Sequence, residues 1–193
     1  MKFELILFAL IVLSIQAYSQ SQNNISVVYG TSATNVDIHG AIGDFGYNAK
    51  SGMVYGLTYT RELTKLFSLE TGLLFATDKA EESSVIPERG NVTFDGNIKL
   101  ISVPVLAKFT FFKYFYADAG TSIDKEINYS NNSVATDQSG LGFELGVGGQ
   151  YTLGHLTIFI NPYIKQYGAI RFNSQQDFNL LEDGYKFGIG YRF

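Results

Sequence analysis

The stretch GYKFGIGYRF, residues 184–193, places an aromatic or aliphatic side chain at every second position. The apolar set is Tyr185, Phe187, Ile189, Tyr191 and Phe193, and it alternates with Gly184, Lys186, Gly188, Gly190 and Arg192. Because successive side chains of a β-strand point to opposite faces, this spacing predicts a strand with one apolar face and one face of glycine and cationic residues.

The same alternation recurs through the chain and predicts eight strands. They fall within residues 25–39, 53–59, 67–75, 101–111, 115–123, 141–152, 156–167 and 185–193. Short connections are expected at 63–66, 112–113 and 153–155, and long polar ones at 40–50, 78–97, 125–139 and 168–183. Alternating short turns and long loops are typical of outer-membrane barrels, in which the short turns face the periplasm.

The residues opposite the apolar faces indicate which way those faces point. Charges of both signs occur there among Gly, Ser and Thr: Glu70, Lys108, Asp118, Glu144, Lys165, Lys186 and Arg192. Inside a closed barrel these charges would neutralise one another while the apolar faces meet lipid. We therefore predict an all-β fold, an eight-stranded antiparallel up-and-down transmembrane β-barrel of OmpA/OmpX-like architecture, whose lumen is plugged by this charge network. A soluble barrel or sandwich with an aromatic core is the alternative.

Residues 1–19 have the pattern of a cleaved secretory signal peptide. Lys2 precedes an apolar run at 5–13, and the small residues Ala17 and Ser19 predict cleavage after Ser19. Residues 20–193 are then expected to form one outer-membrane β-barrel domain.

The composition excludes several classes of function. The chain of 193 residues has a formal net charge of -4 and no basic cluster, so nucleic acid is not expected as a partner. It contains no cysteine, which rules out disulfides and thiolate metal sites. We expect no metal ion and no cofactor.

Four segments resemble the PorT-type outer-membrane β-barrel family of Bacteroidota. They are GLTY at 56–59, FSLETGLLF at 67–75, ISVPVLAKF at 101–109 and YADAG at 116–120. The third segment is similar to a recurring strand of that family, with Pro104 and Lys108 at matching positions, although Thr121 stands where members often carry proline. The resemblance implies an outer-membrane barrel surrounded by lipid. Tyr191 and Phe193 look like the carboxy-terminal signal that barrel-assembly machinery recognises.

Three functions are compatible with such a barrel. The first is a structural or interaction protein that contacts an unknown protein or surface partner, with a link to secretion or surface contact, through its extracellular loops. The second is a small-solute or ion pore. The third is an enzyme at the barrel rim that acts on outer-membrane lipid, for which His39 with Ser32 or Ser51 is the candidate pair. No local motif supports catalysis, so we expect no enzyme.

Overall fold

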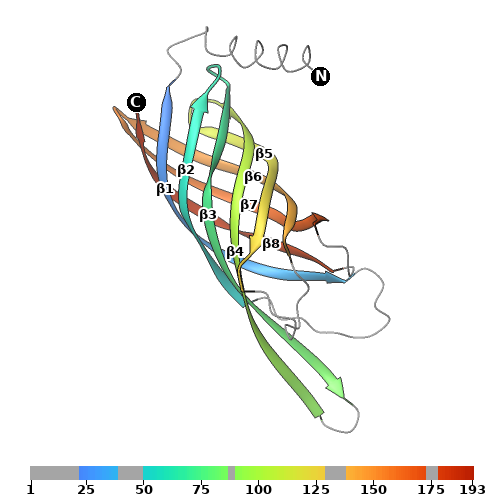
Figure 1. Cartoon of the computed structure of the whole chain (residues 1–193). Helices are drawn as coiled ribbons and strands as arrows, with labels where there is room; N and C mark the ends of the chain where they lie inside the picture. The colour runs from blue at the N-terminus through green and yellow to red at the C-terminus, as the bar shows by residue number, and fades with distance from the viewer. Residues whose placement is uncertain (1–21, 39–49, 87–89, 129–137, 173–177) are drawn as a thin grey trace, which may run out of the picture.

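Eight antiparallel strands close into a barrel in chain order, with the last strand hydrogen-bonded to the first (Figure 1). The structure is a computed structural model that describes residues 22–38, 50–86, 90–128, 138–172 and 178–193. The strands are β1 (Asn23–Ile38), β2 (Lys50–Glu62), β3 (Phe67–Ile86), β4 (Gly90–Phe111), β5 (Phe115–Glu126), β6 (Gly140–Leu153), β7 (Leu156–Arg171) and β8 (Phe178–Arg192). The predicted fold is confirmed. The predicted signal peptide and His39 lie outside the described residues.

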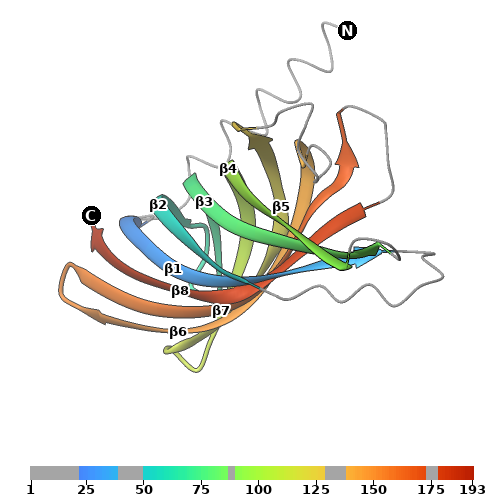
Figure 2. The same cartoon turned by 90° about the horizontal axis from the view of Figure 1, so that it is seen from below.

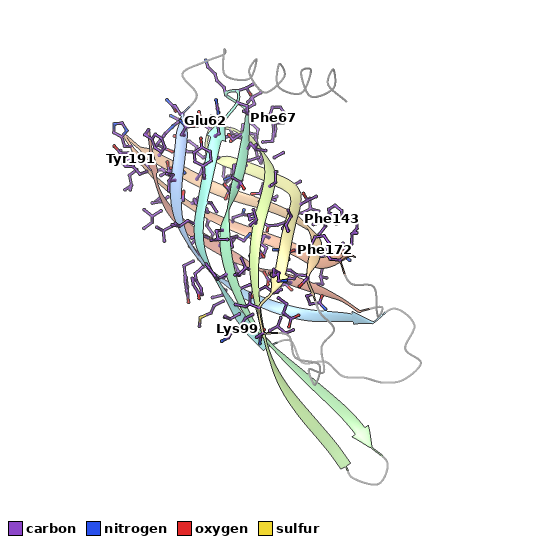
Figure 3. The ribbon with its side chains drawn as sticks, in the orientation of Figure 1. Glu62, Phe67, Lys99, Phe143, Phe172 and Tyr191 are labelled. Atoms are coloured by element: carbon purple, nitrogen blue, oxygen red, sulfur yellow. The ribbon has the colours of Figure 1, made fainter. Side chains whose placement is uncertain are left out.

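One end of the barrel carries the three short turns, at residues 63–66, 112–114 and 154–155. β1 begins and β8 ends at this turn end, and Phe193 and Asn23 exchange two backbone hydrogen bonds of 2.9 Å there. Figure 3 shows Glu62 and Phe67 at the turn end and Lys99 at the opposite end, which we call the loop end.

The prediction of a long loop at 78–97 is wrong. β3 and β4 continue through this segment, and their pairing runs from Asp78↔Ile98 to Ile86↔Gly90. The segment is polar and lacks apolar alternation, because strands that leave the membrane need no lipid-facing side chains; backbone pairing alone continues the hairpin. The pair projects beyond the barrel wall as a two-stranded ribbon (Figure 1).

The predicted loop at 168–183 is also shorter than expected. β7 extends to Arg171, and β8 begins at Phe178 rather than near Tyr185, so much of the expected loop at 168–183 is strand.

Pro104 lies within β4, where the β3–β4 register has no pair between Thr71↔Val105 and Leu74↔Ser102. Proline has no N–H to donate, which accounts for this gap in the ladder.

The outer face of the barrel is apolar and exposed. Val27 and Leu145 expose 63% and 64% of their surface, and the outward side chains of every strand repeat this pattern (Figure 3). A continuous apolar surface of this extent is rare in water-soluble monomers and marks contact with another apolar phase. The described residues form no helix of sufficient length and hydropathy to cross a membrane.

Candidate functional site: the barrel interior

Three lysines inside the barrel share one arrangement. Each ammonium group pairs with one carboxylate and lies over one tyrosine ring. Lys108 contacts Glu70 at 2.7 Å, Lys165 contacts Asp124 at 2.8 Å and Lys186 contacts Glu144 at 2.5 Å. The corresponding rings are those of Tyr116, Tyr167 and Tyr163, whose centroids lie 4.1, 4.2 and 4.1 Å from the nitrogen. An aromatic face and a carboxylate together stabilise a desolvated ammonium.

Hydroxyl and amide groups complete the binding of the buried carboxylates. Asp118 accepts a 2.7 Å hydrogen bond from Asn161, and Glu182 accepts hydrogen bonds from Tyr163 and Tyr167. The carboxylate of Asp124 also accepts from Ser102 at 2.5 Å and from Ser122 at 2.7 Å. Charge-assisted bonds of this kind fix side chains firmly where water is excluded.

Among the described residues, the barrel interior contains more buried carboxylates than buried ammonium groups. The buried carboxylates are those of Glu70, Asp118, Asp124, Glu126, Glu144 and Glu182, and the buried ammonium groups are those of Lys108, Lys165 and Lys186. Each lysine is therefore shared electrostatically among several acids, and the loss of one would leave a large negative excess in a desolvated space.

The structure brings six of the seven predicted lumen charges into this interior, where Glu70, Lys108, Asp118, Glu144, Lys165 and Lys186 are all buried. Arg192 differs because it lies at the turn end, partly exposed, and pairs with Glu62 at 2.5 Å. Sequence reasoning missed Asp124 and Glu182, which lie just beyond the predicted strand and within a predicted loop. Extending the two-residue period by one further step, from Ser122 to Asp124 and from Gly184 to Glu182, would have found them.

Glycines of β6 make room for long side chains from β5. A methyl group at Gly146 would lie 2.4 Å from an oxygen of Asp118, and one at Gly148 would lie 2.4 Å from the ring of Tyr116. Since real Cβ contacts are longer, larger residues at these positions would displace the network. The glycine-rich inner faces of the sequence thus correspond to a densely filled interior.

Aromatic side chains form a belt on the outer surface at the turn end. The stacked or tilted pairs include Phe67–Phe109 at 5.0 Å, Phe111–Phe115 at 6.2 Å and Tyr114–Tyr151 at 6.0 Å. Tyr191 and Phe193 belong to the same outer surface, and the exposed ring of His155 stacks on Tyr191 at 5.5 Å. Such belts occur where a barrel crosses from hydrocarbon to the headgroup region.

Two hollows differ in chemistry and position. An apolar one of about 830 Å³ lies on the outer face against Val27, Ile158 and Phe187. A polar one of about 590 Å³ opens at the turn end and reaches inward to Lys108 and Phe159. A small hollow beside Lys165 and Lys186 measures about 10 Å³, which is no more than one water molecule requires.

Comparison with known proteins identifies the chain as an outer-membrane β-barrel. The chain matches the family "Outer membrane protein beta-barrel domain" over residues 5–193. No curated protein matches it in sequence. Its structure is similar to OprG from Pseudomonas aeruginosa, with 15% identity, a TM-score of 0.55, and coverage of 92% of this chain and 98% of that one. Ail of Yersinia pestis (19%, TM-score 0.48, 91% and 100% coverage) and outer membrane protein W of E. coli (16%, TM-score 0.43, 91% and 100%) are more distant in structure.

At this identity the likeness to OprG shows a shared fold and does not extend to its role. The family match covers nearly the whole chain, and the closed barrel with its apolar outer face agrees with it. The chain belongs to the outer membrane protein β-barrel domain family and is an outer-membrane β-barrel protein.

Proposed function

We propose that this protein is an interaction protein, in which a barrel with a plugged lumen holds the β3–β4 ribbon and the neighbouring loops outside the cell for contact with a protein or surface partner. The observation that carries this proposal is the ribbon. Loops held on a rigid scaffold are where binding functions concentrate. The filled interior, with its paired charges, favours this role over the alternative of a small-solute or ion pore.

Within the part of the chain that the structure describes, the ribbon has an unpaired strand edge on each side. β2 last pairs with β3 at Met53↔Thr77, and β5 last pairs with β4 at Leu100↔Glu126. The carbonyl of Lys99 still accepts a 2.9 Å backbone hydrogen bond from Ile127, and beyond it and Thr77 the described residues of β3 and β4 pair only with each other. Figure 2, a view from below, shows the two strands leaving the ring of the barrel together. An unpaired edge offers backbone N–H and C=O groups to an extended peptide, so strand addition is the expected mode of contact.

Single cysteines test the orientation, because the chain contains none. With Ser83→Cys in β3, an impermeant maleimide added to intact cells is expected to label the protein. His155→Cys, at the turn end, is the matched control and is expected to react only after the outer membrane is opened. Labelling of His155→Cys but not Ser83→Cys on intact cells would contradict the proposed orientation.

The same ribbon is the place to test contact with a partner. A photo-crosslinker at position 127, which is exposed at the base of the ribbon and present in both the native and the shortened chain, is expected to capture a defined partner on the cell surface. Replacement of residues 79–97 by an Asn-Gly turn keeps the Asp78↔Ile98 pair as the end of the hairpin and should abolish the capture while the barrel still assembles. Equal capture by the shortened chain through its other loops would show that the ribbon is not the contact site.

The motifs at residues 56–59, 67–75, 101–109 and 116–120 support placing the protein in the PorT-type group of Bacteroidota as part of this proposal. The proposal includes export with a signal peptide of residues 1–19, after which the mass of the purified protein would correspond to a chain that begins at Gln20.

Assembly is proposed to depend on Tyr191 and Phe193, which the barrel-assembly machinery would bind before the barrel closes. Phe193→Ala is expected to reduce the amount of folded protein in the outer membrane severalfold, because it removes the terminal ring. Its backbone hydrogen bonds to Asn23 would persist, so refolding of the purified variant into lipid vesicles should stay close to normal. An equal defect in cells and in lipid vesicles would show that the variant has lost folding stability and not recognition by the assembly machinery.

We also propose that the protein is not an enzyme. The described residues contain no group of three or more metal-ligating side chains that could hold an ion. Of the residues considered for a rim enzyme, Ser32 is buried in β1. Incubation of the purified protein with outer-membrane lipid, followed by mass spectrometry, is expected to leave the lipid unchanged; a modified acyl or headgroup would contradict this.

A further inference from the structure

The turn end contains a polar cavity of about 590 Å³ that the proposed contact function does not use. Two of the short turns, at 63–66 and 112–114, line it together with residues at the turn end of the strands. Its volume lies in the range of small-molecule sites, roughly 300–1,000 Å³. Its mouth is open and its floor lies within the barrel at Lys108 and Phe159.

Cationic side chains dominate the charged groups that line this cavity. They are Lys65, Lys108, Lys113 and Arg192, against the single carboxylate of Glu62 among the lining residues. Arg192 pairs with Glu62 and Lys108 pairs with Glu70, so the excess of positive charge comes from Lys65 and Lys113. The whole chain carries a formal charge of -4, so this excess is a local feature. Positive charge at the mouth of a concave site with low-dielectric walls concentrates anions there.

Lys108 at the floor retains hydrogen-bonding capacity. An ammonium group has three N–H donors. Among the described residues Lys108, which is only 4% exposed, donates to one acceptor, the carboxylate of Glu70. Its remaining donors lie beside the rings of Tyr116 and Phe159, and Phe159 also lines the cavity. An acceptor inside the cavity would satisfy them.

The walls suit a hydroxylated ring. Thr60, Thr110 and Thr157 line the cavity together with Phe159. The Thr60 hydroxyl donates to Glu70 at 2.9 Å and can still accept a hydrogen bond from a ligand. Hydroxyls recognise hydroxyls by hydrogen bonds, and an aromatic face packs against the apolar face of a ring.

From the cationic mouth, the buried ammonium and the mixed wall, we propose that this cavity binds a small organic anion of the sugar-acid class. The acid group contacts Lys65 and Lys113, and the ring extends toward Phe159. In the orientation proposed above the site opens to the periplasm, but binding to the purified protein does not depend on that orientation or on the ribbon.

Calorimetric titration of the purified full barrel in detergent micelles tests this with three probes. D-glucuronate is expected to bind saturably. D-glucose, which carries a hydroxymethyl group in place of the carboxylate, is expected to bind at least about tenfold more weakly. Inorganic phosphate supplies charge without a ring and is also expected to bind more weakly. Equal binding of glucose, or of phosphate, would overturn the sugar-acid assignment, as would the absence of saturable binding by glucuronate.

Matched variants locate the site. Lys65→Gln combined with Lys113→Asn removes both turn charges, and asparagine tolerates the positive φ of 68° at position 113. This double variant is expected to weaken glucuronate binding at least about tenfold with an unchanged far-UV spectrum. Lys125→Gln removes an exposed charge near the loop end and should leave binding unchanged. Unaltered affinity in the double variant, or an equal loss in the control, would overturn the proposed site.

Discussion

Replacing Lys186 with methionine is expected to lower the free energy of unfolding by about 3–5 kcal/mol, the usual cost of removing one partner from a buried ion pair. Methionine fills a similar volume, so the effect comes from charge. Glu144, which is 1% exposed and contacts Lys186 at 2.5 Å, would remain in the barrel interior without its cation. Urea unfolding of the protein in lipid vesicles, followed by far-UV circular dichroism, measures the change.

The double variant Glu144→Gln with Lys186→Met distinguishes charge imbalance from lost packing. It removes both charges, so it should recover most of the stability that Lys186→Met loses. Lys125→Met, on the exposed surface, is the matched control and should change stability by no more than about 0.5 kcal/mol. A loss below about 1 kcal/mol for Lys186→Met, or no recovery in the double variant, would show that the interior does not depend on this pair.

Substitution of Gly120 by alanine is expected to destabilise the barrel by about 2 kcal/mol or more, at the upper part of the range for overpacking. A methyl group there would lie 2.1 Å from the backbone oxygen of Val105 and 2.8 Å from the Cα of Leu106. Backbone atoms of a neighbouring strand cannot rotate away, so β4 and β5 would have to separate. Refolding yield and urea unfolding in vesicles report the effect.

Gly149→Ala is the matched control for this substitution. Gly149 lies in β6, and the nearest atom to its added methyl group would be the backbone oxygen of Tyr114 at 3.8 Å, an ordinary contact. The free energy of unfolding of the Gly149→Ala variant should change by less than about 0.5 kcal/mol. Similar losses of stability in the two variants would mean that the close approach of β4 and β5 at Gly120 is not the cause of the destabilisation.

The fold was predictable because lipid imposes a strict rule on the membrane-spanning strands. Each outward residue of β8 must be apolar, so Tyr185, Phe187 and Ile189 mark the period directly. The ribbon at 78–97 was not predictable by that rule, since beyond the membrane neither face of a strand has to be apolar. Its pairing rests on backbone hydrogen bonds, which leave no periodic signal in the sequence.

The interior was predictable by residue type but not by partner. Alternation places Lys186 and Glu144 on inner faces, yet they lie 42 residues apart, and their contact depends on the register of strands β6, β7 and β8. Glu182 was missed because the two-residue period was not followed into the loop-end extension of β8. The same alternation places Tyr163 on the inner face with Lys165, but its contact with the ammonium of Lys186 again depends on the strand register.

The central claim is that the described interior is filled by paired charges and tyrosines, so that the barrel displays its ribbon and loops and does not conduct. Recording from the purified protein in a planar lipid bilayer tests this most directly. The account predicts a baseline current with no stable unitary openings at either polarity for the native chain. Reproducible openings of uniform conductance, which persist when contaminating porins are excluded, would contradict it.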